Sequence, residues 1–469
     1  IVLPCAPDDT EKVMYYRACR LFLLPFGILS FTALAAGMSL FTLTSVWFYW
    51  FGVPTFFLVL YLGFHYFGIS VWGKDFNSDG HAKIVRQAEE STFTPTVDVY
   101  LPVCKEPIGL LANTWKFVKE LEYPHVTVHV LDDGAKDDVR DLSIEFGFRY
   151  IRRPNRPELK KAGNLRYAFA RTSGEMILIL DADFCPRPEF LRETLPYFMD
   201  ASVGIVQTPQ YFRWREEQTW VEQGAGVTQE LFYRMGQVNN NRRKASYCVG
   251  TCGVYRRAAL DPLGGMAAVS HSEDIMTGFM LPGLGFQVSY LPLVMAMGIC
   301  PDDPRTFFMQ QYRWCMGSAA LVMSRGFWKS NVSKMQKLCF LSGMMYYVAT
   351  AVLIFLAPLP ILLLILLEAS GVRWFHMAFT VPVFIFALVV LPLWSRQRYG
   401  MSCHRVTVLQ SYAHLYAIRD YLMGTSAPWV PSGGKSSRSS SKAYNSSKWL
   451  LIIWNTSITV LIVGGAAWR

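Results

Sequence analysis

Four long stretches of this sequence contain no Asp, Glu, Lys or Arg. They cover residues 21–73, 338–367, 374–395 and 449–468. A helix that crosses the hydrocarbon core of a bilayer needs about 20 predominantly apolar residues. The first stretch has room for two such helices, near 21–42 and 47–72, and each of the others has room for one. The sequence therefore predicts five transmembrane helices, because soluble helices of this kind would expose too much apolar surface to water.

The basic residues beside these stretches indicate which side of the membrane each connection faces. Lys and Arg stand before the first stretch, after its second helix and after residue 395, whereas the link at 43–46 has none. Cytosolic connections carry an excess of Lys and Arg. We therefore expect an integral membrane protein in contact with lipids, at the plasma membrane, with the N-terminus and segment 74–337 in the cytosol.

The net charge of +10 reflects this bias together with a basic cytosolic segment. No basic stretch accompanies a recognisable nucleic-acid-binding motif, so no nucleic-acid partner is expected.

Three short apolar runs in the cytosolic segment are predicted strands. They are "TVDVYLP" (96–102), "VTVHVLDDG" (126–134) and "MILILDADF" (176–184), and helix-like stretches at 109–122 and 137–147 separate them. This alternation is typical of a parallel sheet. Ligands of such sheets bind beyond the carboxyl ends of the strands. We therefore expect one crevice to be surrounded by Asp98, Asp132, Asp133, Asp181 and Asp183.

The acidic pair Asp181 and Asp183 comes directly after a buried strand. Two carboxylates at positions i and i+2 of a turn can reach the same divalent cation. Mg2+ prefers oxygen ligands and often shares them with substrate phosphates, and Mn2+ suits the same ligands. A solvated loop would be the ordinary interpretation of D-x-D alone. A second acidic turn after "VHVL" favours a metal site instead.

A further acidic turn, "HSED" (271–274), begins a helix-like stretch. Ser272 and Asp274 could simply cap that helix. A cap does not explain the order of the next elements, which are a helix, a glycine-rich turn, a strand and then "QQYRW" at 310–314. We interpret the whole series as functional.

Four motifs in this order resemble a known signature. "VLDDG", "DAD", "SED" and "QQYRW" are similar to the D, DxD, [ST]ED and QxxRW motifs of processive family-2 glycosyltransferases, the membrane β-glycan synthases that include cellulose synthase. The similarity runs from Thr96 to Gly317 and includes "KKAGNLRYAF" (160–169) and "GTCGVYRRAALDPLGG" (250–265). The membrane helices on both sides match the layout of the family.

The resemblance implies an α/β GT-A (Rossmann-like) cytosolic catalytic domain plus an α-helical transmembrane region with interface helices. Residues 1–73 would form an N-terminal region with two transmembrane helices, and 74–316 the glycosyltransferase domain. Residues 317–469 would hold interface helices, three transmembrane helices and a gating loop at 426–447.

The resemblance also implies roles for single residues. Asp274 would be the general base, beside Glu273. The UDP-sugar donor would be held by Asp132, Asp133, Glu106, Lys161, Asp181 and Arg313. Asp181 and Asp183 would bind Mg2+ or Mn2+. The acceptor end of the growing glucan polymer would contact Gln310, Trp314 and Thr251.

The chemistry explains why an Arg and a Trp stand just before an apolar stretch. The leaving UDP gains charge, which the guanidinium of Arg313 can stabilise. Trp314 offers a flat surface for a sugar ring where a channel would begin, although a membrane-interface aromatic is the alternative interpretation.

Two features near the C-terminus fit the same family. Residues 404–422 are predicted to form an amphipathic interface helix, with Val408, Tyr412, Leu415 and Leu422 on its apolar side. Residues 426–447 are a flexible Ser/Gly linker by composition. By position they match the gating loop, in which Trp429, Ser432 and Lys435 would close over the bound nucleotide.

The expected function is therefore processive, inverting β-glucan synthesis from UDP-glucose, with cellulose or a mixed (1,3;1,4)-glucan as the product extruded across the membrane. A hyaluronan- or chitin-type synthase that uses UDP-GlcNAc is the alternative within the same class. The "SED" motif resembles that of cellulose synthases more closely. A dolichol-phosphate-type transferase would lack QxxRW. A non-catalytic membrane scaffold is disfavoured because all four motifs are intact.

Overall fold

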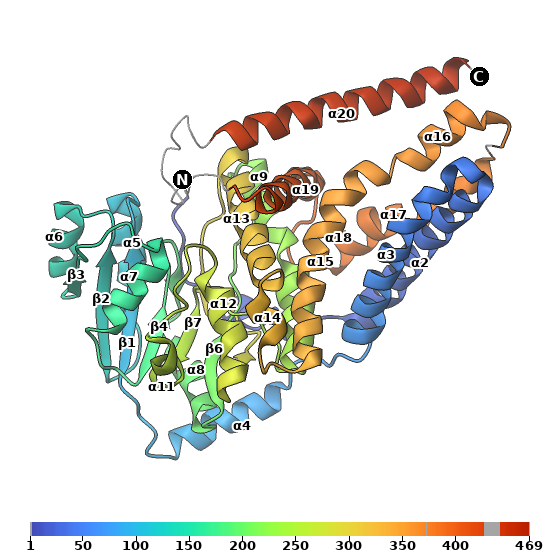
Figure 1. Ribbon diagram of the computed structural model, residues 1–469. Helices are drawn as coiled ribbons and strands as arrows, with labels where there is room; N and C mark the ends of the chain where they lie inside the picture. Colours follow the sequence, from blue (N-terminus) through green and yellow to red (C-terminus); the bar gives the residue numbers. More distant parts are fainter. Residues whose placement is uncertain (1, 372, 426–440, 469) are drawn as a thin grey trace.

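The computed structural model describes residues 2–371, 373–425 and 441–468. An α/β domain lies beside a layer of helices, and the long apolar helices extend away from it (Figure 1).

The described part of the chain contains a seven-stranded sheet in the order β3-β2-β1-β4-β7-β6-β8. The strands are β1 (Val97–Val103), β2 (Val126–Asp132), β3 (Arg149–Ile151), β4 (Met176–Ile179), β6 (Val203–Gln207), β7 (Gly253–Arg256) and β8 (Gln287–Tyr290). The short strands β5 (Cys185–Pro186) and β9 (Ala296–Met297) pair separately. The three strands that the sequence predicted are thus confirmed as β1, β2 and β4.

The expectation of a parallel sheet is only partly correct, because β7 runs antiparallel to both of its neighbours, β4 and β6. Strands β3, β2, β1 and β4 are parallel, and β6 is parallel to β8. The reversed strand comes after a long helical excursion that begins beyond β6, so the simple alternation of strand and helix does not continue there. As a result, the start of β7 lies at the same edge of the sheet as the ends of β4 and β6.

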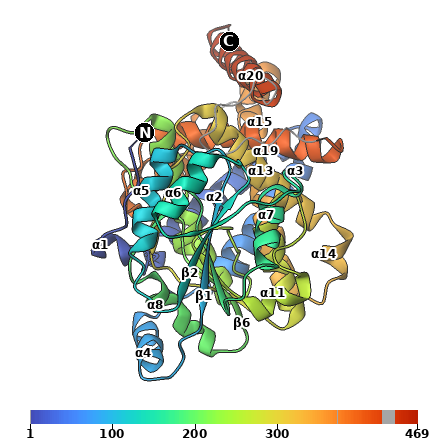
Figure 2. The ribbon, with the colours of Figure 1, turned by 90° about the vertical axis from the view of Figure 1, so that its left-hand side faces the viewer.

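Side chains of the central strands alternate between two apolar layers, as the pleat of a strand requires. Val97, Val99 and Leu101 of β1 pack with α5 (Ile108–Lys119) and α6 (Asp137–Glu145) on one face. Tyr100 packs with α7 (Lys160–Phe169) on the other. Figure 2 shows α5 and α6 on one side of β1 and β2, and α7 on the other. The two helices predicted at 109–122 and 137–147 are therefore confirmed and hold one face of the sheet.

Shorter helices complete the α/β domain and its surroundings. They are α1 (Asp9–Lys12), α4 (Ser78–Glu89), α8 (Phe190–Thr194), α9 (Trp220–Thr228), α10 (Val238–Asn241), α11 (Arg257–Leu260), α12 (Glu273–Met280) and α14 (Arg325–Lys329).

Four helical segments in the described residues are long and apolar enough to cross a membrane. They are α2 (Arg20–Thr44), the segment Val46–Ser70 that includes α3 (Gly52–Gly63), the segment Lys334–Leu367 made of α15 (Lys334–Leu356) and α16 (Leu359–Leu367), and α20 (Ser441–Trp468). The fifth expected span, 374–395, corresponds to the shorter apolar segment Val381–Trp394, which contains α17 (Val381–Ile385) and α18 (Leu391–Trp394). Pro382 stands in the first turn of α17, where a helix begins readily.

Helices α13 (Pro304–Val322) and α19 (Met401–Leu422) form the layer between the α/β domain and the apolar helices (Figure 1). The helix predicted at 404–422 is confirmed as α19. Of the residues predicted on its apolar side, Tyr412 is buried and Val408 and Leu422 are exposed, whereas Val406, His414 and Ala417 are also buried. The polar His414 is buried because α19 packs against α13 and α15 within the protein. The predicted division of the chain at 316/317 also falls inside α13.

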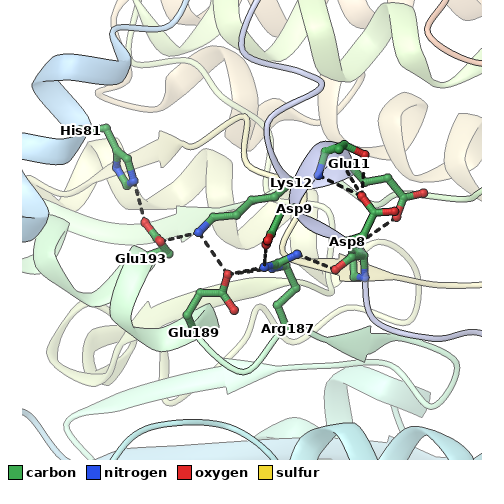
Figure 3. A network of polar contacts seen from close by, with 10 residues as sticks. Asp8, Asp9, Glu11, Lys12, His81, Arg187, Glu189 and Glu193 are labelled. Carbon is green, nitrogen blue, oxygen red and sulfur yellow. Dashed lines mark hydrogen bonds and ion pairs between the residues drawn. The ribbon is translucent and has the colours of Figure 1, made fainter.

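The N-terminal residues pack on the α/β domain rather than on the apolar helices. Arg187, just after β5, donates to the Pro7 carbonyl (2.6 Å) and to Asp9 (2.5 Å). Lys12 reaches Glu189 and Glu193, and His81 of α4 lies 2.8 Å from Glu193. Figure 3 shows this network from close by. The N-terminal segment thereby holds the chain just beyond the acidic pair Asp181 and Asp183.

Replacing Arg187 with Ala is expected to loosen the N-terminal segment. Its buried guanidinium also donates to Glu189, and removing one partner of a buried hydrogen bond costs about 1–3 kcal/mol. We expect faster protease cleavage near residues 2–12 and a lower Tm. Arg192→Ala, at an exposed arginine of α8, is the matched control. Equal cleavage rates in the two variants would contradict this function of Arg187.

Candidate active site

A cavity of about 920 Å³ lies beyond one edge of the sheet. Because β1, β2 and β4 are parallel, their carboxyl ends share this edge, and the start of β7 and the ends of β6 and β8 reach it too. The segments after these strands line the cavity together with the start of α7, the turn before α12 and one face of α13. This is the position at which open α/β sheets bind their ligands.

Asp181 and Asp183 lie in the turn after β4 and both line the cavity. The Asp181 backbone N–H donates to the Thr251 hydroxyl (2.9 Å), and Lys161 donates to the Asp181 carboxylate. Lys161 also donates to the Gly250 carbonyl (2.9 Å). Thr251 is fully buried, so in this structure it holds the acidic turn and does not line the cavity. The predicted contact of Thr251 with the acceptor stays a prediction.

The carboxylates in this turn repel one another. Burial, followed by the charge of Asp181, raises the pKa of Asp183 to about 7. Burial also raises the pKa of Glu106 to about 7, with smaller contributions from Asp181 and Asp132, although its carboxylate accepts from the Cys104 backbone N–H (2.5 Å). A divalent cation would relieve this excess of negative charge, so the donor set fits a metal.

The protein alone does not complete a metal site. Among the described residues, no group of three or more His, Cys, Asp or Glu side chains is placed to hold a metal ion. Asp181 and Asp183 offer two carboxylates, and Mg2+ typically takes only one or two from the protein and the rest from phosphates and water. The arrangement therefore fits a cation that arrives with a phosphate-bearing ligand.

The neighbours Asp132 and Asp133 have different environments. Asp132 is buried, lies behind the cavity wall and accepts from the Ala135 (2.9 Å) and Lys136 (3.0 Å) backbone N–H groups. Asp133 lines the cavity and is held by two 2.6 Å bonds from Arg153. The structure thus brings Asp133 to the site and leaves Asp132 to shape the turn.

The placement of Asp98 at this crevice is wrong. Asp98 is the second residue of β1 and therefore lies at the opposite edge of the sheet. There it pairs with His129 (2.9 Å) and Arg257 (3.1 Å) and accepts from the Gly174 backbone N–H. Its function is to satisfy buried polar groups at that edge.

Glu273 and Asp274 begin α12 and line the same cavity as the Asp181 turn. Ser272 is the N-cap residue but its side chain makes no capping bond, so the capping interpretation is wrong. Gly250 has a positive φ of 78°, and a Cβ there would meet the Asp274 carboxylate. Burial, followed by the charge of Glu273, raises the pKa of Asp274 to about 7. Burial also raises the pKa of Glu273. A carboxylate with this pKa is well suited to accept a proton near neutral pH.

Gln310, Arg313 and Trp314 lie on one face of α13, because residues three and four apart are neighbours on a helix. All three line the cavity. Burial lowers the pKa of Arg313 to about 10, which leaves it charged at neutral pH. The Gln310 side-chain oxygen is buried and has no hydrogen-bond partner among the described residues. The helix starts at Pro304, where Asp303 accepts from two backbone N–H groups.

Trp429, Ser432 and Lys435 of the predicted gating loop lie outside the described residues. Their role in closing over a nucleotide stays a prediction.

Two residues of the cavity with basic side chains were missed from the sequence. Lys160 is the first residue of α7, and His271 lies in the turn before α12. The "KK" pair beside Lys161 was an available signal for Lys160. A single His in a polar turn provides no comparable signal.

Comparisons with known proteins agree with this arrangement. The family described as "Glycosyl transferase family 2" matches residues 98–264. The cellulose synthase catalytic subunit [UDP-forming] of Xanthomonas axonopodis pv. citri is 31% identical over 265 residues, which are 54% of this chain and 36% of that protein. The subunit of the same name from Pseudomonas fluorescens is 33% identical over 260 residues, 54% of this chain and 35% of that protein. The matches thus span about a third of these relatives.

A solved structure is similar over most of the chain. The mannosyltransferase PcManGT from Pyrobaculum calidifontis, in complex with GDP-Man and Mn2+, superposes with a TM-score of 0.54 at 16% identity. The match covers 74% of this chain and 94% of that one.

Proposed function

We propose that the chain belongs to glycosyl transferase family 2, with a GT-A domain related to that of the bacterial cellulose synthases, and that it polymerises glucose from UDP-glucose into a β-glucan. The proposed product is cellulose or a mixed-linkage (1,3;1,4)-glucan, which the membrane helices would pass across the bilayer. We further propose that the protein lies in the plasma membrane, with the α/β domain in the cytosol and the apolar helices in contact with lipids. We also propose that the chain divides into three parts, at 73/74 and at 316/317.

One observation carries the proposal. Asp274, with its raised pKa, lines the same cavity as the acidic turn Asp181–Asp183 and the guanidinium of Arg313. Inverting transfer needs a base for the acceptor hydroxyl on one side and stabilisation of the departing diphosphate on the other. The cavity provides both.

In the proposed reaction Asp274 accepts the proton of the acceptor hydroxyl while the oxygen of that hydroxyl forms a bond to C1 of glucose. The bond between C1 and the donor phosphate breaks, and its electron pair leaves with UDP. Arg313 and Lys161 stabilise the charge that develops on the diphosphate. Asp133 and Glu106 would contact the donor, and Gln310 and Trp314 the acceptor sugar.

Asp181 and Asp183 would hold Mg2+ or Mn2+, which when bound neutralises diphosphate charge as a Lewis acid. The GDP-Man complex of the mannosyltransferase with Mn2+ supports a divalent cation in this fold. We propose that either ion serves, since both accept this oxygen donor set.

The test is synthesis in vitro by the purified full chain in detergent or lipid. Labelled UDP-glucose and UDP-GlcNAc are supplied separately, and the product is digested with linkage-specific glucanases. Polymer from UDP-glucose that these enzymes degrade supports the proposal. Polymer from UDP-GlcNAc alone would instead identify a hyaluronan- or chitin-type synthase.

Polymer synthesis is expected to fall as the pH drops through about 7. Only the deprotonated carboxylate of Asp274 can accept a proton, so below its pKa the rate should fall about tenfold per pH unit. Saturating divalent cation keeps Asp183 deprotonated during the measurement. A rate that stays constant from about pH 8 to pH 5 would contradict a base with this pKa.

A further inference from the structure

Lys160 and His271 line the cavity together with Arg313, but the proposed reaction assigns no function to Lys160 or His271. We propose that these three residues form a diphosphate-binding site in which His271 gains a proton when the nucleotide binds and loses it when the nucleotide leaves. This inference rests on the proposed function only in taking a nucleoside diphosphate as the ligand.

His271 lies in a turn that packs against α13, the helix that carries Arg313. Its neighbour Ser272 adopts a left-handed conformation (φ 52°) and lies over Gly317 of α13 so closely that a Cβ on Gly317 would collide with the Ser272 side chain. Arg313 lies one turn earlier on the same face of α13. The glycine therefore permits the turn before α12 to approach α13, and His271 lies where that turn borders the cavity.

The charges in this part of the cavity repel one another. Burial lowers the pKa of His271 to about 4, and the charges of Lys160 and Arg313 contribute to this shift in that order. Burial and then Arg313 lower the pKa of Lys160 as well. Lys161 forms an ion pair with Asp181. Two cationic side chains, Lys160 and Arg313, and a neutral imidazole thus line the same cavity, and the repulsion between the two cations favours binding of an anion there.

Other charged groups lie on the elements around His271. They are Lys161 on α7, Asp302, Asp303 and Arg305 at the start of α13, and Glu273 and Asp274 at the start of α12. Glu273 and Asp274 interact electrostatically with Lys161. The pKa shift of His271, in contrast, comes from burial and from the two cations, Lys160 and Arg313.

A diphosphate would reverse this balance. Its negative charge removes the repulsion from Lys160 and Arg313, so the imidazolium becomes favourable and can donate a charge-assisted hydrogen bond to a phosphate oxygen. The pKa of His271 therefore rises on binding. Because binding raises this pKa, affinity for the diphosphate increases as pH falls through the raised value, and the proton is released when the product UDP departs.

The experiment measures the affinity of the full chain for UDP, inorganic diphosphate and uridine from about pH 8 to pH 6, the range in which His titrates, with saturating Mn2+. The variants are His271→Gln, Lys160→Gln and the control His125→Gln, an exposed histidine outside the cavity. Titration of the diphosphate itself changes the measured affinity of the wild type and of each variant equally, so its effect cancels in the ratio of wild-type to variant affinity.

The ratio of wild-type to His271→Gln affinity for diphosphate is expected to rise by up to about tenfold as the pH falls from about 8 to about 6. A tenfold change in affinity corresponds to about one unit of pKa. Uridine affinity should be unchanged, and His125→Gln should behave as the wild type. Lys160→Gln should weaken diphosphate binding at every pH, because its charge does not depend on pH in this range. Calorimetry in two buffers of different ionisation enthalpy should show proton uptake that His271→Gln lacks.

Parallel pH profiles for the wild type and His271→Gln would overturn the inference, and so would an equal loss of uridine affinity. Inorganic diphosphate makes the result independent of the sugar and base of the donor. If the pH-dependent difference is present but no polymer forms from UDP-glucose, the diphosphate site stands and the proposed function fails. If polymer forms but the pH profiles of the wild type and His271→Gln are parallel, the proposed function stands and the inference about His271 fails.

Discussion

Asp274→Asn is expected to reduce polymer synthesis by about 10²–10⁴-fold, the usual effect of removing a general base. The amide keeps the shape of the carboxylate but cannot accept the proton of the acceptor hydroxyl. The close approach of Gly250, with no Cβ to collide with residue 274, allows the substitution without steric conflict. Initial rates of polymer formation from labelled UDP-glucose provide the measurement.

The control for this variant is nucleotide binding. UDP affinity should change little, because the assigned diphosphate contacts come from α7, α13, the turn after β4 and His271, and do not include Asp274. The residual activity should also lose its decline below about pH 7, since the group responsible is gone. A variant that keeps half of the wild-type rate would exclude Asp274 as the base.

Asp183→Asn is expected to lower polymer synthesis by about 10²–10³-fold, because a bound metal contributes several kcal/mol of charge stabilisation in the transition state. The cause is loss of one of the two protein carboxylates that would hold the cation. The variant should require a much higher concentration of Mn2+ or Mg2+ for half-maximal rate. Chelation with EDTA should stop the wild-type reaction, and added cation should restore it.

Asp137→Asn is the matched control for this prediction. Its carboxylate is exposed in the first turn of α6 and does not line the cavity. Its activity and metal dependence should equal those of the wild type. Wild-type synthesis that survives exhaustive chelation would refute the metal-binding role of Asp181 and Asp183.

Local patterns in the sequence were sufficient for much of the site. The acidic turn after "MILIL" predicted that Asp181 and Asp183 lie at a ligand-binding edge, and both line the cavity. The i, i+3, i+4 spacing of Gln310, Arg313 and Trp314 is compatible with one helix face, and α13 presents all three to the same space. These features depend on strand direction and helix period, which neighbouring residues in the chain largely determine.

One error arose from applying those patterns incompletely. Asp98 lies near the start of its strand, so the direction of β1 carries it to the far edge of the sheet. Asp132 and Asp133 are consecutive at a strand end, where successive side chains point to opposite sides, and Asp133 is the one that lines the cavity. The donor contact predicted for Asp132 stays a prediction.

The sequence by itself determined the apolar helices, the strands β1, β2 and β4, and the order of the acidic and QxxRW motifs, because each depends on local periodicity and composition. The tertiary structure alone decided the antiparallel course of β7, the buried side of α19 and the presence of His271, Lys160 and Arg313 in the lining of one cavity. These depend on which distant surfaces approach one another. Gly317 is the clearest case, since its missing side chain admits Ser272 only once α13 and the turn before α12 are packed together.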